Sequence, residues 1–283
     1  MPRLVLQLLD LGTRKFWRLA GREVELTGAE QWLDAPMSDS SRVGQEWVAA
    51  EAERHGGPTP CVEDGAGLLP SMAALDGPGF DSRRLRPEVR DFYEHTSAWH
   101  VEVWSGWSPL FWPGGEVISR VWGRRVEQLA LPMRPLDVAR GMDSLVTPIR
   151  DAAGRQVAAA WTRTLRGDGR PVFSGAYSTR TLPGARGPSV HVAFPLESGN
   201  VQVFLRPSLA PGGGLLLESG RGRFGQDGAY VVVRDGGTHA ARVPLHETFH
   251  VFVDEHGVLR TDHQLRLWGA SAVRLHYRLD RVR

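Results

Sequence analysis

The chain has 283 residues, of which 41% are hydrophobic, and its 34 basic and 32 acidic side chains leave a formal net charge of +2. A chain of this kind can bury a large core, which excludes general disorder, and its balanced charge is not that of a nucleic-acid-binding protein. No apolar run approaches the roughly 18 residues of a membrane-spanning helix, and the amino-terminal apolar stretch is too short for a signal peptide. We therefore expect a cytoplasmic protein without a transmembrane segment. Cys61 is the only cysteine, so no disulfide can form within the chain.

Residues 1–85 are predicted to form an irregular amino-terminal region. Ser40 or Ser41 can cap a short helix over residues 45–54, which two following glycines would end. Residues 56–79 are rich in glycine and proline, a composition that predicts a linker or a long surface loop. The main folded unit is therefore expected to span residues 86–283.

A helix and a tryptophan-rich segment are predicted to open this unit. Pro87 suits the first turn of a helix, and the apolar side chains that follow at three-and-four spacing give that helix one buried face. Five of the ten tryptophans then fall within 24 residues, at Trp99, Trp104, Trp107, Trp112 and Trp122. Three interpretations stay open. The segment is a helical or loop lid at 86–125 over an apolar ligand, a wedge in a membrane interface, or a set of core side chains that close one end of a sheet.

Residues 151–283 are rich in β-branched and aromatic side chains, with turn signals every 8 to 13 residues. Ten strands are predicted, over residues 156–165, 172–181, 189–194, 201–206, 215–219, 229–234, 240–243, 248–254, 258–268 and 272–280. Short loops between them favour antiparallel hairpins. We expect a mainly β protein of the α+β kind, an antiparallel calycin-like β-barrel or half-open sandwich of about ten strands. Short helices and the irregular amino-terminal region would precede it.

Four short motifs within the main unit follow one another in a recognisable order. They are residues 86–94, Trp161-Thr162-Arg163, Phe173-Ser174-Gly175 and residues 275–279. On these residues the chain resembles an uncharacterised bacterial domain family whose members occur alone or fused to membrane or saccharopine-dehydrogenase-like proteins. The family has no established activity. The resemblance therefore implies a single β-rich unit that begins near Leu85, with no chemistry attached.

The most pointed chemical signal is an H-E-x-x-H motif that begins at His246, followed by a third histidine at His256. On a helix, His246 and His250 would share a face and could hold one zinc ion while Glu247 activates its water. However, residues 248–254 alternate apolar and polar side chains in the manner of a strand. Histidines four apart on a strand are roughly 13 Å from each other, too far for one zinc with bonds of about 2 Å. We expect no cofactor, and the zinc site stays as the alternative.

One polar side chain interrupts the apolar face of the strand predicted over 258–268. The residues on that face are Leu259, Thr261, His263, Leu265 and Leu267. A buried imidazole must find a hydrogen-bond partner or lose roughly 1–3 kcal/mol. His263 is therefore a candidate general acid/base or ligand contact, although a hydrogen-bonded core histidine is the commoner case. The same alternation predicts that His191 points away from the core and that His276 lies outside.

Trp161 and Arg163 share one face of their predicted strand, and Tyr177 belongs to the next strand. If Arg163 points inward, it could hold a carboxylate or an enolate-like oxygen in a low-dielectric pocket. If the phase is reversed, Arg163 lies on the surface, the commoner position for an arginine on a strand. The candidate ligand contacts are Trp104, Trp107, Trp112, Trp161, Arg163, Tyr177 and His263.

The leading hypothesis is that a β-barrel or cleft binds an apolar small molecule. The protein would act by binding alone or with simple acid/base chemistry of the isomerase or cyclase type, with His263 as the candidate catalytic residue. One alternative is a zinc-dependent hydrolase that uses His246, Glu247 and His250, and a second is an interaction or scaffold protein without a pocket. No nucleic-acid partner is expected, and a homodimer stays open. The sequence does not decide between binding and catalysis.

Overall fold

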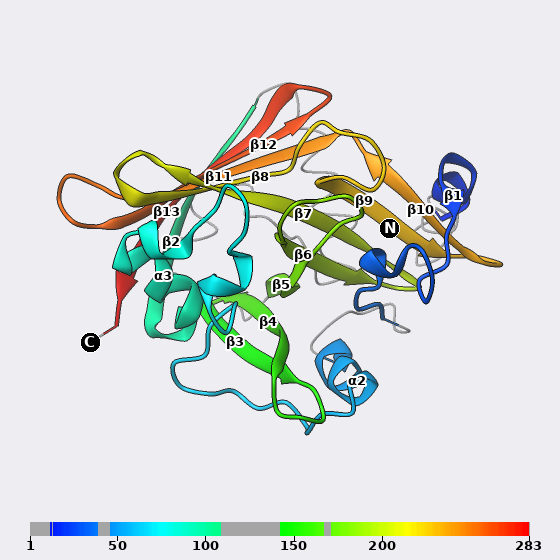
Figure 1. Ribbon diagram of the computed structural model, residues 1–283, viewed down its shortest axis with the longest axis horizontal. Helices are drawn as coiled ribbons and strands as arrows, with labels where there is room; N and C mark the ends of the chain where they lie inside the picture. Colours follow the sequence, from blue (N-terminus) through cyan, green and yellow to red (C-terminus); the bar gives the residue numbers. More distant parts are fainter. Residues whose placement is uncertain (1–11, 13, 39–45, 109–141, 167–170, 283) are drawn as a thin grey trace.

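The computed structural model describes residues 12, 14–38, 46–108, 142–166 and 171–282 (Figure 1). Strands dominate these residues, and all the named strands pair in antiparallel fashion. They are β1 (Arg22–Glu23), β2 (Trp99–Trp107), β3 (Met142–Arg150), β4 (Gln156–Leu165), β5 (Pro171–Arg180), β6 (Ser189–Leu196), β7 (Gly199–Ala210), β8 (Gly214–Glu218), β9 (Gly228–Arg234), β10 (Thr238–Val243), β11 (Leu245–Val253), β12 (Leu259–Leu267) and β13 (Ala270–Arg281).

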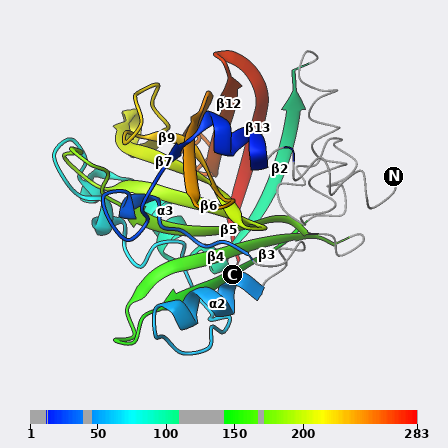
Figure 2. The same cartoon turned by 90° about the vertical axis from the view of Figure 1, so that its right-hand side faces the viewer.

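The main sheet curls into a nearly closed barrel with one unsealed seam. Its strand order is β2-β13-β12-β11-β8-β7-β6-β5-β4-β3. Figures 1 and 2 show this curvature, with β12, β11 and β8 side by side and β3 and β4 on the opposite side. Within the described residues no hydrogen-bonded ladder joins the two end strands, β2 and β3. Val103 of β2 and Met142 of β3 nevertheless belong to one apolar cluster with Leu275 of β13, so side-chain packing draws the seam together.

Strand β7 is the point where the sheet divides. One of its edges pairs with β6. Along the other edge, residues 199–204 pair with β9 and residues 206–210 pair with β8. Strand β9 leads to β10, which pairs in turn with the short β1 near the amino terminus. The barrel therefore carries a small side sheet that receives the amino-terminal part of the chain.

The mainly β, antiparallel barrel predicted from the sequence is confirmed, and each of the ten predicted strands is present. Three further strands, β1, β2 and β3, were not predicted. Strand β2 coincides with part of the tryptophan-rich segment, and its first half does alternate, with Trp99, Val101 and Val103 buried. Strand β3 contains Pro148, which is tolerated because β3 is the last strand of its sheet and has an edge that needs no donor.

Two helices lie at the positions where the sequence predicts them. Helix α2 (Glu46–Arg54) follows the expected boundaries, and α3 (Pro87–Glu94) has its proline in the first turn. Val89, Phe92 and Tyr93 of α3 are buried and join the main core with the inward side chains of the barrel. Short 3-10 turns surround them, at Gln31–Leu33, Met72–Leu75, Ser82–Arg84, Thr96–Ala98 and Pro211–Gly213.

Residues 56–79 differ from the predicted linker or surface loop. Leu68, Leu69, Met72 and Leu75 have at most 1% of their surface exposed and belong to the same core as the barrel interior. Glycine and proline are frequent there because the segment turns repeatedly, while its few large apolar side chains are anchored in the core. The glycine and proline content of the segment predicts its turns but does not predict the burial of its apolar side chains.

Helix α2 covers the outer surface of the barrel on the side of β3 and β4 (Figures 1 and 2). The outward positions beneath it are alanines, including Ala158 and Ala160 of β4 and Ala176 of β5. Small side chains let a helix approach the sheet closely, and the buried Trp47 fills the remaining space. The indole Nε1 of Trp47 donates to Ser174 Oγ at 3.0 Å. This part of the amino-terminal region is therefore integral to the folded unit.

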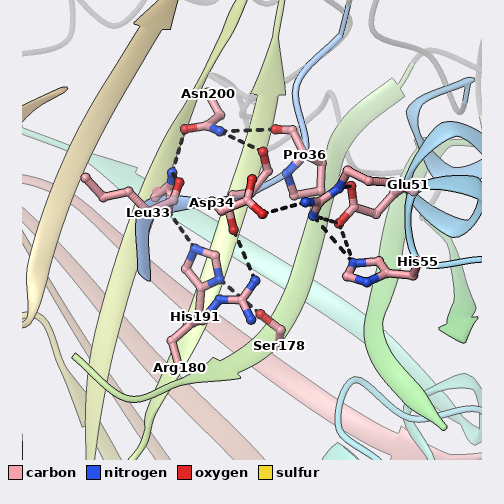
Figure 3. Close-up of polar contacts among 12 residues, drawn as sticks. Leu33, Asp34, Pro36, Glu51, His55, Ser178, Arg180, His191 and Asn200 are labelled. Atoms are coloured by element: carbon pink, nitrogen blue, oxygen red, sulfur yellow. Dashed lines mark hydrogen bonds and ion pairs between the residues drawn. The ribbon is translucent and has the colours of Figure 1, made fainter. Parts of the chain in front are cut away.

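A buried polar network fixes residues 33–36 against the outer faces of β5, β6 and β7 (Figure 3). His191 Nε2 lies 2.9 Å from Gln202 Oε1, and His191 Nδ1 lies 3.0 Å from Ser178 Oγ. Gln202 Nε2 donates to Leu33 O at 2.7 Å, and Asn200 Nδ2 donates to the carbonyl oxygens of Ala35 and Pro36 at 3.2 Å each. Every partner is a side chain or main-chain carbonyl of another segment, so the network ties the amino-terminal region to the barrel.

His191 does point away from the barrel interior, but it is only 2% exposed, because the amino-terminal segment covers it. Its ring stacks on Phe204 with centroids 4.5 Å apart. Burial, reinforced by the charge of Arg180, lowers the pKa of His191 from 6.5 to about 3. His191 is therefore neutral at physiological pH, with Nε2–H donating to Gln202 and Nδ1 accepting from Ser178.

In the described part of the chain, no helix combines the length and the apolar character that crossing a bilayer requires.

Candidate functional site

The barrel interior is lined by alternate residues of each strand, and it brings together four of the sequence-predicted site residues. Trp161 and Arg163 of β4, Tyr177 of β5 and His263 of β12 all project to this side. Gly175 lies opposite Trp161 in the register of β4 and β5. A Cβ at position 175 would meet the ring of Phe173 at 3.1 Å, so the glycine leaves room for the aromatic side chains to gather.

Arg163 points inward and is only 8% exposed, which settles the two interpretations left open by the sequence. Its guanidinium carbon lies 3.7 Å from the ring centroid of Trp161, 5.4 Å from that of Tyr277 and 5.7 Å from that of Phe173. The Trp161 ring is itself fixed, because its Nε1 donates to Ser144 Oγ at 2.7 Å. Arg163 therefore lies in an aromatic cage.

This guanidinium lacks an anionic partner in the described part of the chain. Of the carboxylates described, none comes within 4.0 Å of Arg163, and its Nε is enclosed without a hydrogen-bond acceptor. Cation–π contact contributes about 2 kcal/mol when the pair is desolvated, whereas burial of an uncompensated charge costs several kcal/mol. Burial accordingly lowers the pKa of Arg163, while Tyr277 and Tyr177 oppose that shift. The cage offsets only part of the cost of this buried charge.

Two tyrosines of the interior, Tyr177 and Tyr277, are influenced by the charges of both Arg163 and Glu247. Burial raises the pKa of both Tyr177 and Tyr277, so their hydroxyl groups are neutral and can donate hydrogen bonds. The positive charge of Arg163 lowers the pKa of each tyrosine, and the negative charge of Glu247 raises it. Both hydroxyl groups therefore lie within electrostatic reach of a cation and an anion.

Glu247 and His263 form a pair on neighbouring strands. His263 Nε2 lies 3.2 Å from Glu247 Oε2, and the side chains are 10% and 13% exposed. The imidazole stacks on Phe249, with centroids 3.7 Å apart and planes inclined by 16°. The Glu247 carboxylate accepts from Nε2–H and thereby fixes the orientation of the ring. His263 Nδ1 is enclosed and has no hydrogen-bond partner among the described residues, which leaves a lone pair inside the barrel.

Several inward side chains remain only partly buried although they face the interior. They include Phe173, Tyr177, Glu247, Phe249, His263 and Tyr277. By contrast, inward residues of β6 and β7 such as Val190, Val203 and Leu205 are almost completely enclosed. The interior is thus filled on the side of β6 and β7 and is incompletely covered around the Arg163–Glu247 axis.

Of Trp104, Trp107 and Trp112, the candidate contacts that were predicted to cover a ligand at the barrel mouth, only Trp104 has a side chain that the structure describes. Trp104 is 50% exposed and lies opposite the exposed His276 in the register of β2 and β13, so it belongs to the outer surface. Trp107 is the last residue of β2, and its side chain is outside what the structure describes. Trp112, with the rest of the predicted lid beyond residue 108, lies outside the described residues. The part of the predicted lid at 99–107 is a strand of the barrel wall.

The H-E-x-x-H segment is extended, as the strand pattern predicts. It lies within β11, where Glu247 shares the inward face with Phe249 and Val251. His246 and His250 have the opposite parity and lie on the outer face. His256 is 77% exposed in the turn before β12. The strand thus separates the glutamate from the histidines, and the described residues contain no group of three metal-ligating side chains.

Sequence reasoning missed two members of the interior cluster. Glu247 was considered only as a base in a zinc site, and Tyr277 was not a candidate. The alternation of β11 and β13 contains the missing signal, since it puts Glu247 in phase with Phe249 and puts Tyr277 in phase with Leu275. The alternation within each strand does not give the register between strands, which brings these side chains together.

Comparisons with models of known protein families, with curated proteins and with solved structures found no match. The resemblance of residues 86–283 to an uncharacterised bacterial family stays a prediction.

Proposed function

We propose that the protein binds an apolar small molecule inside the barrel. The observation that supports this most directly is the incomplete burial of inward aromatic side chains, among them Phe249 and Tyr277, whereas Val190, Val203 and Leu205 of β6 and β7 are almost completely enclosed. Partly covered aromatic faces beside a few polar groups are typical of a small-molecule site. The cytoplasmic location and the calycin-like character of the barrel belong to the same proposal.

Strand β11 supplies a matched pair of residues for testing this function. Phe249 and Phe252 are both partly buried, but Phe249 faces the interior and stacks on His263, whereas Phe252 lies on the outer face and stacks on His250. The two substitutions to alanine remove the same side chain from the same strand. Only the inward one changes the proposed site.

The assay is fluorescence titration with the neutral apolar dye N-phenyl-1-naphthylamine. The wild-type protein is expected to bind the dye with saturation, Phe252→Ala to bind it equally well, and Phe249→Ala to bind it about tenfold more weakly or more, since truncation of a large interior aromatic loses about 1.4 kcal/mol or more of contact. Circular dichroism confirms that each variant is folded. Absence of saturable binding by the wild type, or equal loss in the two variants, would contradict the proposal.

Acid/base chemistry is a narrower form of the same proposal, centred on the Glu247–His263 pair. Glu247 orients the imidazole, and the free lone pair of His263 Nδ1 is the proton acceptor that such chemistry needs. In the structure this nitrogen is enclosed, so a reacting group would have to displace the atoms around it. The dye titration tests binding alone and does not depend on this step.

A further inference from the structure

The second feature of the interior is an unbalanced charge. Arg163 is more than nine-tenths buried, faces the inside of the barrel and has an Nε without an acceptor. Cations on barrel interiors are normally paired, because an unpaired charge in a low-dielectric setting is costly. An arginine without an anionic partner at this position is unfavourable for folding, and a role of the charge in ligand binding would account for it.

The surroundings restrict what the anion can be. Arg163 supplies a single positive charge, and the nearest additional donors are the neutral hydroxyl groups of Tyr177 and Tyr277. The negative charge of Glu247 also acts on both tyrosines and raises their pKa. A dianionic phosphate would remain under-compensated in this setting, whereas a planar monoanion matches the guanidinium fork and its single charge.

The remaining walls specify the rest of the molecule. Trp161, Phe173 and Phe249 present aromatic faces to the interior. Such faces favour hydrocarbon or aromatic groups, and the described walls carry few polar groups for a chain rich in hydroxyls. The ligand therefore has one anionic end and an apolar body.

We propose that Arg163 is the anchor for the carboxylate of an apolar monocarboxylic acid bound inside the barrel. This inference rests on the proposed function and names the class of ligand. Tyr177 and Tyr277 donate hydrogen bonds near the same head group, and the aromatic walls enclose the body of the acid. Arg163 is a binding residue in this role, with no part in bond making or breaking.

The experiment compares 2-naphthoate with its neutral analogue 2-naphthamide as competitors of N-phenyl-1-naphthylamine. The two compounds share size and shape and differ in charge, so the ratio of their dissociation constants measures the contribution of the anionic contact. The variants are Arg163→Met, which removes the charge, Arg163→Lys, which keeps the charge but loses the fork, and Arg274→Met, which removes an exposed arginine on the outside of β13.

The wild type and Arg274→Met are expected to prefer 2-naphthoate by about tenfold or more, as hydrogen bonds to a buried charge typically give. The preference should be smaller in Arg163→Lys and near unity in Arg163→Met, with affinity for the neutral dye retained. The inference is overturned if the wild type shows no preference for the acid, or if the preference survives in Arg163→Met. If Arg163→Met does not fold, Arg163→Lys decides the matter, because an undiminished preference for 2-naphthoate in that variant also overturns the inference.

The two proposals fail in different ways. If the wild type binds the dye but neither naphthalene compound, or binds both equally, the carboxylate anchor is refuted and the apolar site stands. If the wild type binds none of the three, the proposed function is refuted and the anchor with it.

Discussion

Acid should loosen the attachment of the amino-terminal segment through His191, and the size of the effect follows from its burial. The pKa of His191 falls from 6.5 in the unfolded chain to about 3 in the folded protein. Between these values the unfolded state binds a proton that the folded state does not, so the free energy of unfolding decreases as pH falls. The contribution is intact above pH 6.5 and is lost progressively between pH 6.5 and about 3. From pH 7 to pH 5 this one group should remove about 2 kcal/mol of stability.

Urea unfolding at pH 7, 6 and 5, followed by tryptophan fluorescence, measures this loss. His191→Gln keeps a hydrogen-bonding side chain without a titrating imidazole, so its stability should decrease less than that of the wild type over the same range, by about 2 kcal/mol. His256→Gln, which replaces an exposed histidine in a turn, should follow the wild type. The reasoning fails if His191→Gln and the wild type lose stability in parallel, whatever their absolute stabilities at pH 7.

Two substitutions test how closely α2 and the strand next to it approach each other. In Gly57→Ala the added Cβ would overlap the carbonyl oxygen of Arg150, so we expect the free energy of unfolding to fall by about 2–4 kcal/mol, measured by thermal or urea unfolding. The control is Gly106→Ala, whose Cβ would meet nothing closer than 3.9 Å and which should leave the free energy of unfolding nearly unchanged. Equal stability of these two variants would show that the close approach is not maintained in solution. Ala160→Leu places a larger side chain beneath α2 and should cost about 1–3 kcal/mol by overpacking; an unchanged midpoint in the same assay would mean that α2 is not seated there.

The strands of this protein were predictable because their side chains alternate. Leu259 to Leu267 show the pattern in full, and the structure places His263 on the inward face that the pattern assigned to it. The same pattern cannot say what lies over the other face. His191 was correctly placed outside the barrel, yet its burial depends on residues 33–36, which are more than 150 positions away in the chain.

The interior cluster was predictable only in part for the same physical reason. Trp161, Arg163, Tyr177 and His263 were chosen from separate strands, and their proximity depends on the register and closure of the sheet. The orientation of Arg163 was the most difficult to predict, because an arginine on a strand usually lies on the surface. Only its place two residues after Trp161, on the same face of the strand, indicates an inward orientation. The prediction of a lid was wrong for residues 99–107, which form a strand, because the clustering of tryptophans was interpreted without regard to the alternation of the side chains.

The branching of the sheet at β7 has a consequence for how the chain reaches this structure. Val201 and Val203 enter the core, while Asn200 and Gln202 form hydrogen bonds with the amino-terminal segment. A register slip of one residue would therefore turn the two amides toward the apolar interior and place the two valines against polar main-chain groups. The strand must also find β6, β8 and β9 before its alignment is fixed. Binding of residues 33–36 to β7 is the step we expect to come late in folding, because these residues lie 164 to 169 positions from their partners on β7 and closure of so long a loop is entropically costly.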